Sequence, residues 1–353
     1  AGAAPDARAR REAYARLRAT RPSFQQTMLR IRDPQASLEF YTQRLGMAHV
    51  DTYHFDDMGF SLYFLQSFDA DAAPEPAAMG APGSDAAHAH LWSTRGSVLE
   101  LTHNHGDEGA SAEVYHPGNA EGDGFGHIAF NCDDVYASCE RLEKSGVGFK
   151  KKPDEGRMKG LAFALDPDGY WVEIVQRSEQ SRIGAEFNLS QTMLRVRNPA
   201  ASLAFYRDGM GMTLVRESHY PEANFSLYFL ASLPQGERVD YDPADRAASR
   251  AFVGALHAPV LELTHNHGSE SEPGFEYKNG NEEGARGFGH VGFLVEDVEE
   301  ACAAVEAAGG TLAKRPEGGT MKGLAFARDP DGYMVEIVKR GGYGDASAPY
   351  YTE

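Results

Sequence analysis

The chain has 353 residues, 42% apolar and 24% charged, a composition typical of a globular protein long enough for two domains. Its formal net charge of −18 argues against nucleic acid as a partner, because a phosphate backbone requires a basic face. No apolar run reaches the length of a membrane span, so we expect a soluble protein that does not associate with membranes.

Two features bear on the cellular compartment. The three cysteines, Cys132, Cys139 and Cys302, are odd in number and form no C-x-x-C pair, which favours a reducing compartment and a cytoplasmic protein. Residues 1–23 are rich in alanine and arginine, and we interpret them as an N-terminal helical arm lying on the following domain. The alternative interpretation is the remnant of a transit peptide, which would place the protein in an organelle.

The first module of predicted secondary structure begins at residue 24. Residues 26–32 alternate between the two faces of a half-buried strand. Asp33 and Pro34 then supply a helix N-cap and a first helical residue, and Gly46 ends the helix. Further strands are expected near residues 49–53, 60–65 and 97–102, with an inserted Ala/Pro-rich loop at about residues 69–88.

The same order of elements recurs three more times along the chain. In each first strand, a glutamine or histidine stands seven residues before the helix cap: Gln26, His127, Gln191 and His290. Each last strand carries one glutamate between apolar residues: Glu100, Glu173, Glu262 and Glu336. The sequence therefore predicts an α+β fold of four βαβββ modules in two tandem repeats, with modules paired into curved mixed sheets or barrels.

The predicted domain boundaries follow from the repeats and from polar segments between them. We expect an N-terminal arm at 1–23, a first two-module domain at 24–178, a linker at 179–187, a second two-module domain at 188–340 and a tail at 341–353.

The repeated glutamates predict metal binding. A carboxylate within an apolar strand is costly to bury unless it is paired or bound to a metal. Four separate ion pairs at equivalent positions are a weaker explanation than two metal sites. Two facing modules would surround an ion with a glutamine, a histidine and two glutamates, a set of N and O ligands that suits Zn²⁺, Ni²⁺, Co²⁺ or Mn²⁺.

Several motifs resemble those of glyoxalase I (lactoylglutathione lyase), a family of the vicinal-oxygen-chelate superfamily. These are Gln-Gln-Thr-Met-Leu-Arg, Phe-Ser-Leu-Tyr-Phe-Leu, Leu-Glu-Leu-Thr-His-Asn, Gly-Phe-Gly-His and Met-Lys-Gly-Leu-Ala-Phe with Asp-Pro-Asp-Gly-Tyr. The resemblance covers about residues 24–178 and 188–340, as in the two-domain, single-chain form of the family.

The resemblance implies that modules pair across the two repeats to form two metal sites. The first, called here the His290 site, would contain Gln26, Glu100, His290 and Glu336. The second, the His127 site, would contain Gln191, Glu262, His127 and Glu173. A glutamine as the first ligand resembles the Zn²⁺ form of the family, with Ni²⁺ or Co²⁺ as alternatives.

The resemblance also implies the reaction, a metal-assisted isomerisation of the methylglyoxal–glutathione hemithioacetal to S-lactoylglutathione. Glu336 and Glu173 would be the main bases, and Glu100 and Glu262 would serve the opposite hand of the substrate. Implied substrate-binding residues are Arg30, Asn104, Arg286, Lys314, Met321 and Lys322 in the first site, and Arg195, Asn266, Lys151, Arg157, Met158 and Lys159 in the second. Phe60, Leu62, Phe64, Phe225, Leu227 and Phe229 either line the pockets or pack in the core.

One departure from the family pattern distinguishes the two repeats. Arg286 precedes Gly-Phe-Gly-His in the second repeat, whereas Asp123 stands there in the first. We therefore expect unequal sites, with tighter glutathione binding at the His290 site; the alternative is that only this site is active. Because the repeats pair internally, we expect a monomer.

Two other functions fit the sequence less well. An iron dioxygenase on the same fold would require two histidines and one carboxylate in each site, and here each site has one histidine. A binding protein that has lost turnover would not require glutamates in both halves.

Overall fold

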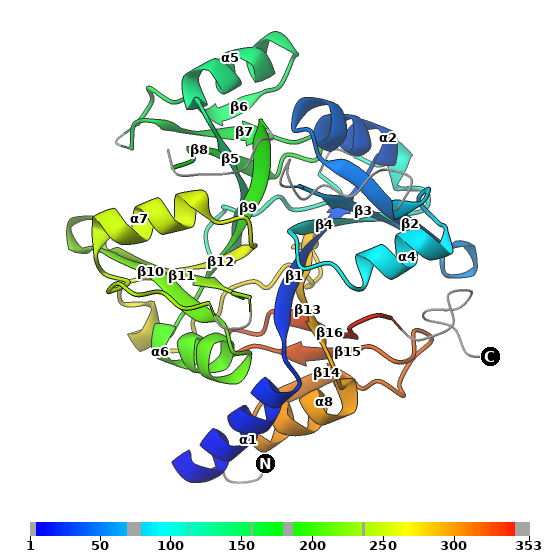
Figure 1. Cartoon of the computed structure of the whole chain (residues 1–353). Coiled ribbons are helices and arrows are strands. Elements are labelled where there is room, and N and C mark those ends of the chain that lie inside the picture. The colour runs from blue at the N-terminus through cyan, green and yellow to red at the C-terminus, as the bar shows by residue number, and fades with distance from the viewer. Residues whose placement is uncertain are drawn as a thin grey trace.

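The computed structural model describes residues 5–68, 79–111, 113–156, 158–178, 186–234 and 237–342, and it contains four βαβββ modules (Figure 1). The first two comprise β1 (Ser23–Ile31), α2 (Pro34–Leu38), β2 (Ala48–Phe55), β3 (Phe60–Gln66), β4 (Val98–Asn104), β5 (Phe125–Cys132), α5 (Val135–Lys144), β6 (Phe149–Lys151), β7 (Leu161–Leu165) and β8 (Trp171–Gln176). The last two comprise β9 (Phe187–Arg195), α6 (Pro199–Leu203), β10 (Thr213–Tyr220), β11 (Phe225–Ala231), β12 (Val260–Asn266), β13 (Phe288–Val295), α8 (Val298–Ala307), β14 (Thr311–Lys314), β15 (Ala325–Arg328) and β16 (Met334–Lys339). The predicted α+β class is confirmed.

The modules pair across the two repeats, not within them. One eight-stranded sheet has the order β14-β15-β16-β13-β1-β4-β3-β2, and the other has the order β10-β11-β12-β9-β5-β8-β7-β6. At the centre of the first sheet β1 lies antiparallel to β13, with Met28 opposite His290. At the centre of the second β5 lies antiparallel to β9, with His127 opposite Met193. Each sheet is thus completed by one module from each half of the sequence.

Local sequence explains where the module helices begin and end. The Asp33 carboxylate accepts hydrogen bonds from two backbone N–H groups of the first turn of α2, that of Gln35 at 2.9 Å. Pro34 occupies the first helical position, where no N–H is needed. The helix continues into a wider π-helical turn, Glu39–Arg44, and Gly46, with φ of 69°, then lets the chain reverse toward β2.

The two sheets share one apolar core. The largest buried cluster contains side chains from all four modules. Phe125 of β5 stacks on Phe288 of β13 with ring centroids 5.1 Å apart, and the hydroxyls of Thr27 and Thr192 are hydrogen-bonded at 2.6 Å. These contacts join the two central strand pairs, so the sheets are held in one fixed relation.

In the described part of the chain, three α-helices are additional to the βαβββ pattern: α1 (Ala7–Ala19), α4 (Asp85–Leu91) and α7 (Arg246–Ala255). α1 belongs to the segment interpreted as an arm, and it packs against α8 and the π-helical turn Ala204–Gly209 (Figure 1). Its Leu17 is fully buried, and Arg16 forms a bidentate ion pair with Glu300. None of the described helices is long and apolar enough to cross a lipid bilayer.

The expectation of a loop at residues 69–88 is wrong at its end, because α4 begins at Asp85. Ser84 caps this helix through its side-chain oxygen, and Ala87 and Leu91 are buried beneath it. Residues 69–78 lie outside the described residues, as do residues 179–185 of the predicted linker, residues 343–353 of the predicted tail and residues 1–4.

Candidate functional site

Each sheet brings a glutamine, a histidine and two glutamates together at its centre. In the first sheet these side chains come from four adjacent strands, namely Glu336 of β16, His290 of β13, Gln26 of β1 and Glu100 of β4. In the second sheet the equivalent strands carry Glu262 of β12, Gln191 of β9, His127 of β5 and Glu173 of β8. Because the central pair β1–β13 or β5–β9 joins the two repeats, each group contains two residues from each half of the chain.

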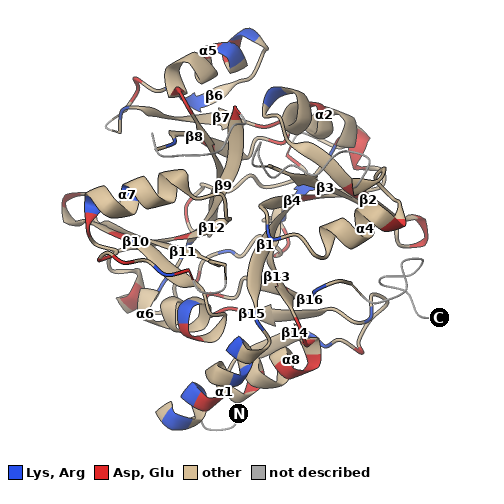
Figure 2. Ribbon diagram, in the orientation of Figure 1, with Lys and Arg blue, Asp and Glu red and all other residues tan. Residues whose placement is uncertain are grey.

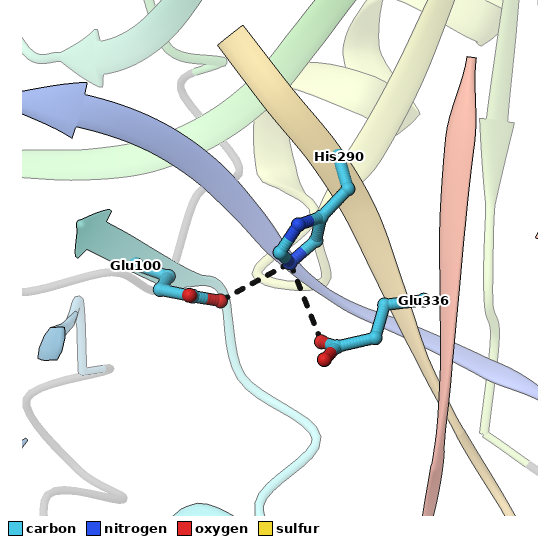
Figure 3. Close-up of side chains that lie close together, drawn as sticks. All are labelled: Glu100, His290 and Glu336. Carbon is cyan, nitrogen blue, oxygen red and sulfur yellow. Dashed lines mark hydrogen bonds and ion pairs between the residues drawn. The ribbon is translucent and has the colours of Figure 1, made fainter. Parts of the chain in front are cut away.

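The His290 site is compact and almost fully buried. The His290 Nε2 atom lies 3.2 Å from Glu100 Oε2 and 3.3 Å from Glu336 Oε2 (Figure 3). The Gln26 amide nitrogen donates to the same two oxygens at 2.9 and 2.7 Å. All four residues are at most 5% exposed. The possible ligand atoms of His290 and the two glutamates therefore surround one point.

The His127 site repeats this arrangement. The His127 Nε2 atom lies 3.3 Å from Glu173 Oε2 and 3.6 Å from Glu262 Oε2. The Gln191 amide nitrogen donates to these carboxylates at 3.1 and 2.7 Å. In each site the histidine nitrogen and two carboxylate oxygens lie within 4.8 Å of one another. The structure thus brings together both sets of four residues that the sequence singled out.

The charges of these groups strongly affect one another because the sites exclude water. Burial opposes protonation of His290, but the carboxylates of Glu100 and Glu336 outweigh it and raise the pKa of His290 to about 10. The same balance, with Glu173 as the main partner, raises the pKa of His127 to about 9. Burial raises the pKa of Glu100. Both sites therefore favour a positive charge between the carboxylates.

The donor atoms fit a divalent cation. Among the described residues, the Gln26 side-chain oxygen and the His127 Nε2 atom are buried without a hydrogen-bond partner. Amide oxygen, imidazole nitrogen and carboxylate oxygen are all metal ligands, and a set without thiolate suits Zn²⁺, Ni²⁺, Co²⁺ or Mn²⁺. Two carboxylates would balance a dication in each site.

A cavity of about 380 Å³ opens onto the His290 site. Its polar residues outside the metal-ligand group are Arg30, Thr102, Asn104, Asn281 and Lys314. Its apolar walls are formed by Met28, Phe60, Leu62, Phe64, Trp92, Ala313, Met321, Phe326 and Met334. A concave pocket with many apolar and few polar side chains is typical of a small-molecule site.

The polar side chains of this cavity are held by fixed partners. Arg30 donates to the Asn281 side-chain oxygen at 2.9 Å, and burial lowers the pKa of its guanidinium. The Asn104 amide donates to the Tyr115 hydroxyl at 2.6 Å. Lys314 donates to a backbone carbonyl at 2.7 Å, and burial lowers the pKa of its ammonium group. These contacts orient three of the predicted substrate-binding residues before any ligand arrives.

Two other predicted residues of the His290 site lie farther out. Arg286 lines a neighbouring, larger cavity of about 730 Å³, together with Tyr115 and His116. Lys322 is exposed and lines neither of these cavities. Met321, in contrast, lines the inner cavity beside Phe326.

The predicted residues of the His127 site divide in a similar way. Arg195 and Asn266 line a cavity of about 530 Å³ that also borders Asp123. Lys151 donates to a backbone carbonyl at 2.7 Å, as Lys314 does in the other sheet. Met158 is 53% exposed and Lys159 is exposed, so neither is enclosed. Arg157 lies outside the described residues.

Asp123 is almost completely buried at the rim of this cavity. Its carboxylate accepts a hydrogen bond from the Ala120 backbone N–H at 2.6 Å and lies 3.5 Å from the Lys278 ammonium and 3.4 Å from the His116 ring. The charge that replaces Arg286 is therefore partly balanced by Lys278.

Several site residues were missed by the sequence reasoning. Asn281 and its counterpart Asn119 orient Arg30 and Arg195, and Trp92 closes the inner end of the first cavity. The asparagines occupy equivalent places in the two repeats, a signal available in the sequence. No repeated motif identifies Trp92, because it lies just beyond the segment interpreted as an inserted loop and has no tryptophan counterpart in the second repeat.

Comparison with known proteins agrees with the geometry. The pattern of the Glyoxalase/Bleomycin resistance protein/Dioxygenase superfamily matches residues 23–174 and 188–337. The lactoylglutathione lyase of Schizosaccharomyces pombe is 39% identical over 320 residues, covering 89% of this chain and 95% of that protein. Glyoxalase I of Saccharomyces cerevisiae is 40% identical over 326 residues, covering 89% and 91%.

A solved structure of glyoxalase I has a similar fold. The crystal structure of glyoxalase I from Zea mays covers 92% of this chain and 95% of its own, with a TM-score of 0.63 and 25% sequence identity. The superfamily pattern occurs twice in this chain, and the two yeast relatives align over nearly all of it. The chain therefore belongs to the glyoxalase I family of this superfamily, with the two tandem repeats in a single polypeptide.

Proposed function

We propose that the protein is a lactoylglutathione lyase, which isomerises the hemithioacetal of methylglyoxal and glutathione to S-lactoylglutathione. The observation that carries the proposal is the pair of buried groups, each with one glutamine, one histidine and two glutamates from both halves of the chain. The sequence similarity to lactoylglutathione lyases over 89% of the chain supports the same reaction.

The four residues of each group are proposed to hold one divalent metal ion. Zn²⁺ is the first candidate, with Ni²⁺ or Co²⁺ as alternatives, because all three accept oxygen and nitrogen ligands without a thiolate. When bound, such an ion supplies positive charge that stabilises negative charge developing on the substrate oxygens. The protein contributes the fixed positions of the ligands and a site from which water is largely excluded.

The glutamates are proposed to move the proton. Glu336 in the first site and Glu173 in the second take the proton from the carbon that bears the sulfur and return it to the neighbouring carbon. Glu100 and Glu262 perform the same transfer on the opposite hand of the substrate. The reaction conserves all atoms and electrons of the hemithioacetal, and burial of each carboxylate limits loss of the proton to water.

Glutathione is proposed to bind at the polar ends of the cavities, where cations and amides meet its carboxylates. Arg30, Asn104 and Lys314 serve this role in the first site, with Arg286 in the neighbouring cavity, and Met321 contributes to the wall. Arg195, Asn266 and Lys151 are the equivalent residues of the second site. Lys322 in the first site, and Arg157, Met158 and Lys159 in the second, are proposed to add further contacts to glutathione. We expect weaker glutathione binding there because Asp123 stands in place of a cation.

Each site is built within one chain, so we propose that the enzyme acts as a monomer. The three cysteines are free and buried, which is consistent with a reducing compartment, and we propose the cytoplasm. An organelle remains the alternative if the N-terminal segment is part of a targeting signal.

The proposal is tested with purified protein supplied with each candidate metal in turn. We expect thioester formation from methylglyoxal and glutathione, and two metal ions per chain by elemental analysis. His290→Ala and His127→Ala should each reduce the metal content to one ion per chain, whereas His219→Ala, at an exposed position outside both sites, should retain two. Absence of thioester formation with every metal would refute the proposed reaction.

A further inference from the structure

The two sites differ in the wall beyond their glutamate ligands. In both sheets, three residues on three adjacent strands lie directly opposite one another and form a row. Directly paired residues point to the same face of a sheet, so the whole row faces the side on which the glutamate ligand lies. The rows consist of Glu100, Phe64 and Asp51 in the first sheet and Glu262, Phe229 and Arg216 in the second. The outermost member is therefore an anion in one site and a cation in the other.

In the His290 site, the carboxylate of Asp51 is held within the wall by hydrogen bonds. Asp51 is fully buried and accepts hydrogen bonds from the His88 ring at 2.6 Å and the Gly83 backbone N–H at 3.0 Å. These contacts hold α4 against the sheet, and the residue that follows α4, Trp92, closes the cavity. Its indole ring lies 5.8 Å from the Phe64 ring, centroid to centroid. This end of the cavity is therefore lined by the aromatic rings of Phe64 and Trp92.

In the His127 site, the cation lies on the wall itself. The Arg216 guanidinium carbon is 5.0 Å from the centroid of the Phe229 ring, and its Nε atom donates to the Ser218 hydroxyl at 3.2 Å. No carboxylate in the described part of the chain is within ion-pair distance of Arg216. Six residues before the glutamate-bearing strand the second sheet has Gly254 in place of Trp92, and the residue that follows α7 is Leu256, which packs against the cluster containing Phe229. Arg216 thus adds a cation to the apolar wall that Phe229 and Leu256 form.

A second cation appears on the opposite wall. Ala313 and Met334 line the cavity of the His290 site, and the residues 163 positions earlier are Lys150 and Trp171. The Lys150 ammonium lies 5.7 Å from the centroid of the Trp171 ring. That ring is 5.1 Å from Phe163, which in turn contacts the histidine ligand. Figure 2 shows the basic residues of β6 at the end of this sheet.

Arg216 lies at the opposite end of its site from the residues proposed to bind glutathione. Strands β3 and β4 are antiparallel, so Phe60 lies opposite Asn104 at one end of the cavity and Phe64 opposite Glu100 at the other. Arg30 and Asn104 line the polar end, whereas Phe64 and Trp92 line the apolar end, to which we assign the aldehyde substituent. Arg216 occupies this second end in the His127 site.

We propose that the His127 site takes hemithioacetals of 2-oxoaldehydes whose substituent carries a carboxylate or phosphate, whereas the His290 site takes aliphatic or aromatic substituents. This inference rests on the proposed function and assigns a different substrate class to each site. The chemical step is the same proton transfer between adjacent carbons, and the charged substituent is unchanged by it. Arg216 and Lys150 act by binding that substituent, as guanidinium and ammonium groups bind anions elsewhere.

The experiment compares enzymes with one working site. In the variant called Glu336→Gln, Glu100 is also replaced by glutamine, so that only the His127 site works. In the variant called Glu173→Gln, Glu262 is also replaced by glutamine, so that only the His290 site works. Each is supplied with glutathione and either phenylglyoxal or 4,5-dioxopentanoate, and kcat/KM is measured for both. We expect the ratio of the carboxylate probe to the phenyl probe to be about tenfold higher for Glu336→Gln, because one charge-assisted contact is worth about this factor. The preference of the Glu336→Gln enzyme for the carboxylate probe should decline as ionic strength rises, because salt screens the attraction between opposite charges.

Second substitutions identify the residues responsible. In the Glu336→Gln protein, Arg216→Met and Lys150→Ala should each lower the ratio toward that of Glu173→Gln. Lys152→Ala is the matched control, because this neighbouring exposed lysine is paired with Glu143 and should leave the ratio unchanged. Equal ratios in the two single-site enzymes, or no turnover by Glu336→Gln alone, would overturn the inference. Failure of both single-site enzymes to convert the methylglyoxal adduct would instead count against the proposed function.

Discussion

At the scale of single residues, a glycine controls the placement of one glutamine ligand. Gly292 of β13 lies opposite Gln26, and a β-carbon at this position would come within 2.4 Å of the Gln26 Cγ atom. The equivalent residue of the second sheet is Ala129, which lies opposite Gln191. Gln26 can therefore lie closer to the neighbouring strand than Gln191 can. The two groups therefore have the same four ligand types but differ in the residue that packs against the glutamine, which is Gly292 in one and Ala129 in the other.

We predict that Gly292→Ala weakens metal binding at the His290 site alone. The added methyl group must displace the Gln26 side chain from its hydrogen bonds with the two glutamates, at 2.9 and 2.7 Å. Changes in the support of a ligand typically cost about tenfold in metal affinity. Competition with a chelator should show one of the two ions released more readily. Ala129→Gly is the control and should leave the His290 site unchanged; release of both ions at the original affinity from Gly292→Ala would contradict the prediction.

Two buried aspartates make stability depend on pH. Asp166 accepts a hydrogen bond from the Tyr41 hydroxyl at 2.8 Å, and Asp329 accepts one from Tyr206 at 2.9 Å. Burial, with a smaller effect of a second aspartate in the same turn, raises the pKa of each to about 7. Because this pKa exceeds that of the unfolded chain, about 3.9, the folded state binds the proton more tightly. The resulting stabilisation is fully present at low pH and is lost as pH rises through about 7.

We predict that replacing both aspartates by asparagine flattens this dependence. The protein should lose on the order of 2 kcal/mol of unfolding free energy per carboxyl between pH 5 and pH 8, and the Asp166→Asn, Asp329→Asn variant should lose less. Asparagine resembles the protonated acid and does not titrate. Urea unfolding at the two pH values measures the difference, with the exposed Asp57→Asn as control. The same pH slope in the double variant would show that these carboxyls do not titrate as described.

At the scale of elements, helix α1 contacts one module of each sheet. It packs on α8 of the fourth module and on the π-helical turn that follows α6 of the third. Asp6 caps it by accepting hydrogen bonds from two backbone N–H groups. Arg18 donates to the backbone carbonyl of Asp208, and Tyr14 packs against Gly209. The helix thus joins the two sheets through contacts with one module of each.

We predict that Leu17→Ala destabilises the whole molecule by about 2–5 kcal/mol, the usual cost of emptying a fully buried leucine site. The measurement is the free energy of urea unfolding of the purified protein. Arg11→Ala, on the exposed face of the same helix, serves as control and should have little effect. Equal stability of Leu17→Ala and the parent would mean that α1 contributes nothing to the shared core.

The sequence predicted most elements because their signals are local. Asp33 and Gly46 mark the ends of one helix through capping and φ preference, and alternating polarity marks the strands. α4 was missed because its short alanine- and histidine-rich sequence lies next to a proline-rich segment, and its stability comes from burial of Leu91. Tertiary contacts, not propensity, decide such a helix.

The candidate site was predictable to the extent that repetition reveals it. Four glutamates at equivalent places indicate a shared role, and the structure brings them together in two groups. Arg216 and Lys150 could not be identified in this way, because each differs from its counterpart in the other repeat. Their relevance depends on strand register, which places Arg216 opposite Phe229, and register is set by the pairing of whole strands.

At the scale of the whole molecule, neither half of the chain contains a complete site. The central pairs β1–β13 and β5–β9 join the two halves, and each metal group takes two ligands from each half. Separation of the halves would expose both central strand edges and the core between the sheets. The covalent connection between Ser178 and Glu186 is therefore not what holds the halves together.

We predict that cutting the chain between these two residues leaves the enzyme assembled. A protease site inserted there should allow complete cleavage while both fragments remain in one complex, with two metal ions and unchanged glyoxalase activity. The buried area shared by the two sheets provides the association, so the fragments should separate in size-exclusion chromatography only in denaturant. Protein without the inserted site, treated with the same protease, is the control. Separation of metal-containing, active fragments in native buffer would show that each half is complete, in conflict with the observed strand order.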